Sequence, residues 1–198
     1  MRLRALLFGA AKGLVTLAAT SDTLSALGNT RSGERSDLMF ENEATLVKFC
    51  CEYLSKISGD ISDADLSNET NGKTPRWILG HLRVVADMPR PMVGLESKLD
   101  ETWVANYGPG SKPGGADGPS FELAQVVTET VGAYKELAEA ARGADAEVMA
   151  QPHGLPILDG TALKTRGDLI SHLLSTHFSF HLAQLSACRQ AKGLGPLF

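Results

Sequence analysis

Apolar residues recur at three- and four-residue spacing along four stretches of the chain, separated by loops rich in glycine, proline or aspartate. This periodicity is typical of amphipathic helices, and no window shows the alternation expected of a half-buried strand. The stretches cover residues from about 43 to 58, 74 to about 89, 120 to 142 and 165 to about 193. Four helices with one apolar stripe each can bury those stripes against one another. The pattern therefore predicts an all-α protein built as a four-helix bundle.

Local signals indicate where the predicted helices begin and end. Thr74 precedes a proline, a pairing in which threonine caps free N–H groups and proline occupies the first helical position. Ser120 is the predicted cap of the third helix, and Gly143 is its predicted stop. Thr165, with Asp168 three residues later, predicts a capping box at the start of the last helix.

The same spacing predicts which residues face the core. In the first helix these are Leu46, Phe49, Cys50, Tyr53 and Ile57, and in the third they are Ala124, Val127, Val131, Tyr134 and Ala138. The stretch 106–119, between the second and third helices, is rich in glycine and proline. We expect that stretch to lie on the surface, because it has little apolar material to bury.

Length and composition favour a single globular domain over residues 39–198. Apolar residues make up 43% and charged residues 21% of the chain, which is ordinary for a globular protein. Residues 1–38 read either as a dispensable extension or as a weak export signal, with a basic start, an apolar run and a polar linker. We expect a cytoplasmic protein, with export as the alternative. The apolar run is too short for stable insertion into a membrane.

Charge and cysteine content exclude other classes of protein. The formal net charge is −4 and the basic residues are scattered, so no stripe is available to neutralise a phosphate backbone, and we expect no nucleic-acid partner. The three cysteines form neither a disulfide framework nor a CxxC metal motif. We expect buried, reduced thiols.

Three histidines are the candidate functional residues. His177 and His181 are one helical turn apart, a separation at which two imidazoles can bind the same metal ion. His81 lies on the inward stripe of the second helix. A shared cation would satisfy three buried imidazoles, and it would leave a coordination position open. The alternative is that each histidine is an ordinary hydrogen-bonded core residue.

Two other histidines are not expected to be ligands. His172 lies roughly opposite His177 around a regular α-helix, so it should face solvent. His153 is in a loop and is interpreted as an ordinary surface residue.

Two segments together resemble the DinB/YfiT-like superfamily of metal-binding four-helix bundles. They are Trp77–Leu82, with sequence WILGHL, and His177–Leu185, with sequence HFSFHLAQL. The resemblance covers about Met39 to the C-terminus and implies a DinB-like bundle. It also implies one divalent metal ion, such as zinc or nickel, on His81, His177 and His181. Gln184 follows the pair as in the family, and we expect it to orient a ligand or a bound group.

The resemblance leaves the reaction open. Some similar proteins transfer or isomerise with low-molecular-weight thiols, so a metal-dependent S-transferase or hydrolase that acts through an activated water or thiol is one hypothesis. The partner would then be a small-molecule substrate or thiol. The alternative is a non-catalytic metal-binding or structural bundle, and a homodimer through the helix faces is compatible with both.

Overall fold

The structure is a computed structural model that describes residues 39–112 and 118–197. Within these ranges the chain is helical and contains no strand, only isolated bridges between Thr70 and Lys73 and between Pro152 and Thr165. The prediction of an all-α protein is confirmed. The predicted extension over residues 1–38 lies outside the described residues.

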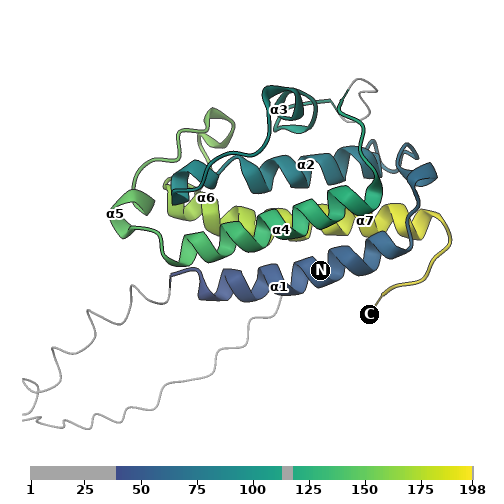
Figure 1. The fold of residues 1–198 in the computed structure, drawn as a ribbon, viewed down its shortest axis with the longest axis horizontal. Helices are drawn as coiled ribbons and strands as arrows, with labels where there is room; N and C mark the ends of the chain where they lie inside the picture. Colours follow the sequence, from purple (N-terminus) through teal and green to yellow (C-terminus); the bar gives the residue numbers. More distant parts are fainter. Residues whose placement is uncertain (1–38, 113–117, 198) are drawn as a thin grey trace, which may run out of the picture. The chain divides into compact units, whose positions relative to one another are not determined.

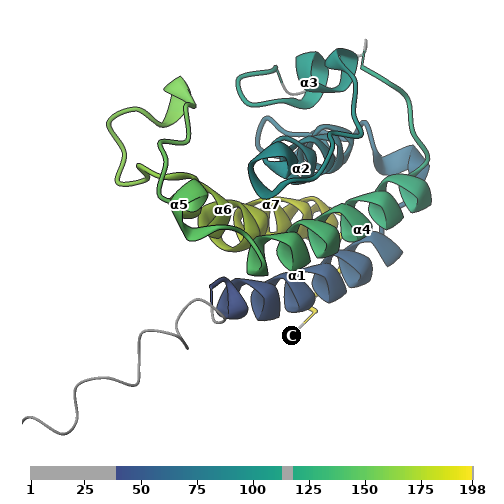
Figure 2. The same cartoon turned by 60° about the vertical axis from the view of Figure 1, so that its left-hand side comes forward.

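Four helical rods form the body of the described region (Figure 1). They are α1 (Glu41–Gly59), α2 (Pro75–Asp87), α4 (Leu123–Arg142), and a composite rod made of α6 (Arg166–His172), a π-helical turn (Leu173–His177) and α7 (Phe178–Ala191). Helices α1 and α2 each contact both α4 and α7. The core is therefore enclosed between the rods, and Figure 2 shows the same arrangement from another side.

Short helices lie in the segments that connect the four rods, and the apolar periodicity did not predict them. These are α3 (Glu101–Tyr107), α5 (Ala146–Met149) and the 3₁₀ turns Asp63–Asp65, Arg90–Val93 and Pro156–Leu158. Asp100 and Asp145 cap α3 and α5, each accepting two backbone N–H groups. An aspartate cap was thus the available signal, but helices of this length carry too few residues to show a stripe.

Most of the predicted helix ends are confirmed. The hydroxyl of Thr74 accepts the backbone N–H of Trp77, and α2 ends before the prolines that follow it. Thr165 and Asp168 form the predicted capping box. Gly143 is the residue at which α4 stops.

The predicted cap at Ser120 is wrong. Helix α4 begins at Leu123, and the N-cap residue Glu122 makes no side-chain cap. The N–H of Leu123 instead donates to the Asp63 carboxylate at 2.9 Å. Because that acceptor is sixty residues away in the sequence, no local motif could reveal it.

The predicted inward stripes of α1 and α4 are correct in part: Cys50, Ile57, Tyr134 and Ala138 are buried as predicted, but three of the other predicted residues are exposed. Leu46 and Phe49 are 46% and 53% exposed, and Ala124 is also exposed. The full set of buried positions is Val47, Cys50, Cys51, Leu54 and Ile57 in α1, and Leu123, Val126, Thr130, Ala133, Tyr134, Leu137, Ala138 and Ala141 in α4. Apolar residues cover two adjacent stripes on α1, so the packing neighbours decide which stripe is buried.

The segment between α2 and α3 is held by a buried carboxylate. Asp87, at the end of α2, accepts the hydroxyl of Ser97 and the backbone N–H groups of Lys98 and Leu99. Arg83 and Arg90 lie beside it as ion-pair partners. This anchor fixes the chain just before α3, which supplies a contact to the candidate site.

The three cysteines are free and buried, as predicted. Burial raises the pKa of the Cys51 thiol to about 11. Among the described residues, no helix is both long enough and apolar enough to cross a membrane.

Candidate metal centre

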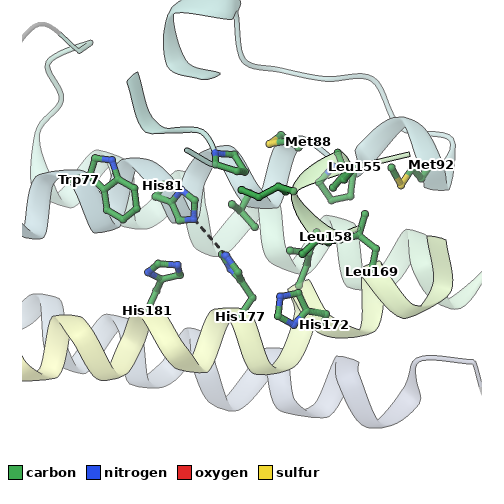
Figure 3. Close-up of a pocket in the computed structure, with 15 residues that line it drawn as sticks. Trp77, His81, Met88, Met92, Leu155, Leu158, Leu169, His172, His177 and His181 are labelled. Carbon is green, nitrogen blue, oxygen red and sulfur yellow. Dashed lines mark hydrogen bonds between the residues drawn. The ribbon is translucent and has the colours of Figure 1, made fainter. Parts of the chain in front are cut away.

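His81, His177 and His181 converge in the interior, between α2 and the composite rod (Figure 3). One ring nitrogen from each histidine lies within 4.8 Å of the other two. His81 and His181 are buried, and His177 is partly buried. The convergence predicted from the sequence is confirmed, and the cluster is one that could hold a metal ion.

His81 is oriented by a backbone carbonyl. Its Nδ1 lies 2.6 Å from the carbonyl oxygen of Tyr107, so Nδ1 carries the proton and donates it. The other nitrogen, Nε2, is then an unprotonated lone pair that faces the cluster. This arrangement is the one in which an imidazole binds a metal.

Tyr107 reaches His81 because Gly80 has no side chain. A Cβ atom at Gly80 would lie 2.5 Å from the Tyr107 ring, which is too close for two carbon atoms. Tyr107 is only 2% exposed, and its hydroxyl donates to the carbonyl of Pro119. The expectation that the whole stretch 106–119 lies on the surface is thus wrong at its start, where the stretch contributes a core tyrosine.

His181 is oriented by Gln184, one turn later in α7. The Nδ1 of His181 lies 2.9 Å from Oε1 of Gln184 and donates to it, which again leaves Nε2 unprotonated. Gln184 therefore contacts one of the three histidines, at the position where the sequence led us to expect an orienting residue.

In the part of the chain that the structure describes, hydrogen bonds do not give every ring nitrogen of the cluster a partner, and His177 is the clearest case. Its Nε2 lies 3.4 Å from Nε2 of His81, and because that nitrogen is unprotonated, His177 is the one that can donate. The Nδ1 of His177 is buried and has no hydrogen-bond partner among the described residues. The Nδ1 of His181 is already bound to Gln184, so the Nε2 lone pair of His181 is available to a metal ion.

A shared metal ion would give the ring nitrogens more partners than hydrogen bonds alone. Two imidazole nitrogens bound to one tetrahedral zinc ion at 2.0–2.1 Å stand about 3.3 Å apart. The 3.4 Å between His81 and His177 matches that separation. A shared ion would use the Nε2 lone pairs of all three rings and leave only the Nδ1 N–H of His177 unpaired. The donor set therefore fits a divalent metal.

Burial keeps the cluster uncharged. Burial, together with the neighbouring imidazoles, lowers the pKa of His177 to about 2 and that of His181 to about 3. Burial also lowers the pKa of His81. At neutral pH the rings are in the neutral form that metals require.

Trp77 forms one wall of the cluster. Its ring stacks on His81, with the ring centroids 4.6 Å apart and the planes 10° from parallel. The indole N–H donates to the Ser111 hydroxyl, and the Lys73 ammonium lies 4.0 Å from the indole ring. Trp77 therefore restricts the rotation of His81 and excludes water from one side.

The expectation that His172 faces solvent is wrong. His172 is partly buried and lines the same cavity as the cluster, with its ring centroid 5.4 Å from that of His177. In a regular α-helix these residues would be about 140° apart. The chain from Leu173 to His177 is π-helical, so residues five apart stand about one turn from each other and share a face.

His153 does not join the cluster. Its Nε2 donates to the carbonyl of Leu163, and its Nδ1 accepts the N–H of Leu155. The His153 ring is partly buried and is hydrogen-bonded to the backbone of its own loop, so it is not the ordinary surface residue that we expected.

A cavity of about 270 Å³ opens onto the histidines. Besides the imidazoles and Trp77, its lining residues are Val85, Met88, Pro89, Met92, Pro109, Leu155, Ile157, Leu158, Leu169 and Leu173. Figure 3 shows Leu155, Leu158 and Leu169 beside His172 and His177. The candidate metal centre therefore adjoins a space in which a small molecule can bind.

A scan against protein-family models and a search of curated proteins found no match to this chain. The assignment of a function therefore depends on the geometry above and on the two motifs that resemble the DinB/YfiT-like superfamily.

Proposed function

We propose that this protein is a DinB-like four-helix bundle that binds one divalent metal ion, such as zinc or nickel, through His81, His177 and His181. One observation carries the proposal: three neutral imidazoles from two separate helical rods bring their nitrogens within 4.8 Å of one another. The Nε2 atoms of His81 and His177 are 3.4 Å apart, close to the separation of two imidazole nitrogens on one tetrahedral zinc ion.

The contacts between the four rods support the DinB-like arrangement. The two motifs that resemble the superfamily lie in α2 and in the π turn with α7, and these elements contact each other. The site residues also follow the order of the family motif: His81 comes first, then the pair His177 and His181, and then Gln184.

The cavity favours a catalytic role over a purely structural one. Structural zinc sites are closed by four protein ligands, whereas catalytic sites keep a position open. Within the described residues the cluster offers three histidines and adjoins a cavity. A divalent ion held there would act as a Lewis acid and lower the pKa of water or of a thiol. The reaction class we favour is thus transfer of a thiol or hydrolysis.

The chain's own residues position this chemistry. Tyr107 and Gln184 fix the rings of His81 and His181, and the apolar walls exclude water. Asp87, an acidic residue near the end of α2, is engaged by backbone N–H groups and two arginines. It serves to anchor the chain, so we assign it no role as a general base.

Metal stoichiometry tests the proposal. Full-length protein without a histidine tag should bind one equivalent of zinc, as measured by elemental analysis after gel filtration. His177→Ala should abolish stoichiometric binding, because it removes one of three ligands. His153→Ala is the matched control and should bind one equivalent, since its ring lies outside the cluster. One equivalent of zinc retained by His177→Ala contradicts the assignment.

A non-catalytic metal-binding bundle is the second candidate. The observation that favours it is the buried Nδ1 of His177, which lacks the hydrogen-bonded neighbour that commonly supports a metal-bound imidazole. Protein that binds one equivalent of metal but turns over neither thiols with electrophiles nor esters would support this second candidate.

A further inference from the structure

The cavity beside the histidines indicates which molecules can bind there. Its walls come from α2, the Arg90–Val93 turn, the loop around Leu155 and the start of the composite rod (Figure 3). Apart from histidine, none of the described lining residues has an acidic or basic side chain. The polar side-chain groups are the imidazoles and the Trp77 indole, and that indole N–H is already bound to Ser111.

We propose that the cavity binds a small, uncharged, largely apolar molecule with a single lone-pair atom directed at the histidine cluster. This inference rests on the proposed metal centre, because the ion would receive that lone pair. It goes further by naming the class of substrate.

The volume limits the size of the molecule. A cavity of about 150 Å³ holds benzene, so the 270 Å³ found here suits roughly ten non-hydrogen atoms. A molecule of this size has room for one aromatic ring or a short branched chain beside its ligating atom.

The absence of charged side chains from the described walls of the cavity limits which molecules can bind there. A carboxylate placed among Val85, Leu158 and Leu169 would lose its water without gaining a cationic partner. Arg83 and Arg90 are paired with acidic groups outside the cavity, and Lys73 lies over the Trp77 ring. Thiols that carry several carboxylates therefore fit this cavity poorly, whereas a small apolar thiol fits it.

Phenylimidazole is a suitable probe, because it is uncharged, of the right size and has one ligating nitrogen. We would load the full-length protein with Co²⁺ and follow the visible absorption of the cobalt during titration. Phenylimidazole should change the cobalt spectrum saturably. Its para-carboxylate derivative has the same ligating ring and should bind at least about tenfold more weakly, since its charge must enter the apolar walls.

A pair of variants locates the binding site. Leu158→Glu puts a carboxylate on the cavity wall and should weaken phenylimidazole binding at least about tenfold. Leu194→Glu makes the same change at a partly exposed leucine outside the cavity and should leave binding unchanged. Circular dichroism verifies that both variants fold, and the comparison of the two ligands on the unmodified protein needs neither variant.

The spectrum before any ligand is added separates the two proposals. Absence of cobalt bands would overturn the metal centre and with it the substrate inference. Normal cobalt bands with equal affinity for the two ligands, or with a folded Leu158→Glu variant that binds phenylimidazole normally, would overturn the substrate inference alone.

Discussion

At the scale of single residues, the site depends on small packing choices around His81. Gly80 leaves room for the Tyr107 ring, and the Tyr107 carbonyl then fixes the proton on Nδ1 of His81. The sequence correctly predicted that His81 faces the interior. It did not predict the tyrosine, because Tyr107 is 26 residues away and is the last residue of a helix too short to show an apolar stripe.

Gly80→Ala should destabilise the protein, although alanine is the better helix former. The added methyl group would meet the Tyr107 ring, and overpacking of this kind costs about 1–3 kcal/mol against a helix gain of about 1 kcal/mol. Urea unfolding measures the change. Gly132→Ala in α4 is the control, because a Cβ there meets nothing within 4 Å, and it should be neutral or stabilising. Equal effects of the two substitutions would refute the role assigned to Gly80.

The free energy of unfolding of the metal-free protein should decrease as the pH is lowered below about 6.5. The pKa values of His177 and His181 are lowered to about 2 and 3, from the ordinary 6.5 that they regain on unfolding. Below pH 6.5 the unfolded chain binds protons that the folded chain does not, so stability is complete above pH 6.5 and is lost as the pH falls towards the folded values. Each histidine contributes a slope of up to about 1.4 kcal/mol per pH unit.

Urea unfolding in chelator between pH 7 and pH 5 measures this slope. Replacing both His177 and His181 by glutamine, which does not titrate, should flatten the curve. A curve with the same slope in the double variant would show that other groups cause the pH dependence.

At the scale of elements, the sequence predicted the long helices well and their rotation poorly. The apolar period and the caps at Thr74 and Thr165 located α2 and the start of α6. Cys50 and Ile57 of α1 are buried as predicted, whereas Leu46 and Phe49 are exposed, because two adjacent stripes are apolar and only the packing neighbours distinguish them. The π turn at Leu173–His177 gave no sequence signal, and it moved His172 onto the cavity side.

The anchoring of the segment before α3 depends on Asp87. Asp87→Ala would leave Arg83 and Arg90 buried beside unpaired N–H groups, and breaking such a buried pair costs about 3–5 kcal/mol. Glu136→Ala removes a half-exposed carboxylate that also contacts Arg90, and it should cost about 1 kcal/mol or less. Thermal unfolding of the two variants checks this order, and a milder effect for Asp87→Ala would contradict it.

At the scale of the whole molecule, the rods α1, α2, α4 and α7 enclose one core and present three histidines to one cavity. The sequence was sufficient to predict an all-α protein and the convergence of the histidines, because helical spacing carries both kinds of information. It could not predict the cavity, whose walls come from segments far apart in the chain. The loop around Leu155 is one such segment, and its contribution depends on tertiary packing.

X-ray absorption spectroscopy of the zinc-loaded, tag-free protein identifies the atoms bound to the metal. Three imidazole nitrogens are expected at about 2.0–2.1 Å from the zinc ion, together with a further light-atom ligand from solvent. A first shell that contains sulfur, or one that lacks the outer-shell scattering of three imidazole rings, would contradict the assignment of His81, His177 and His181 as the metal ligands.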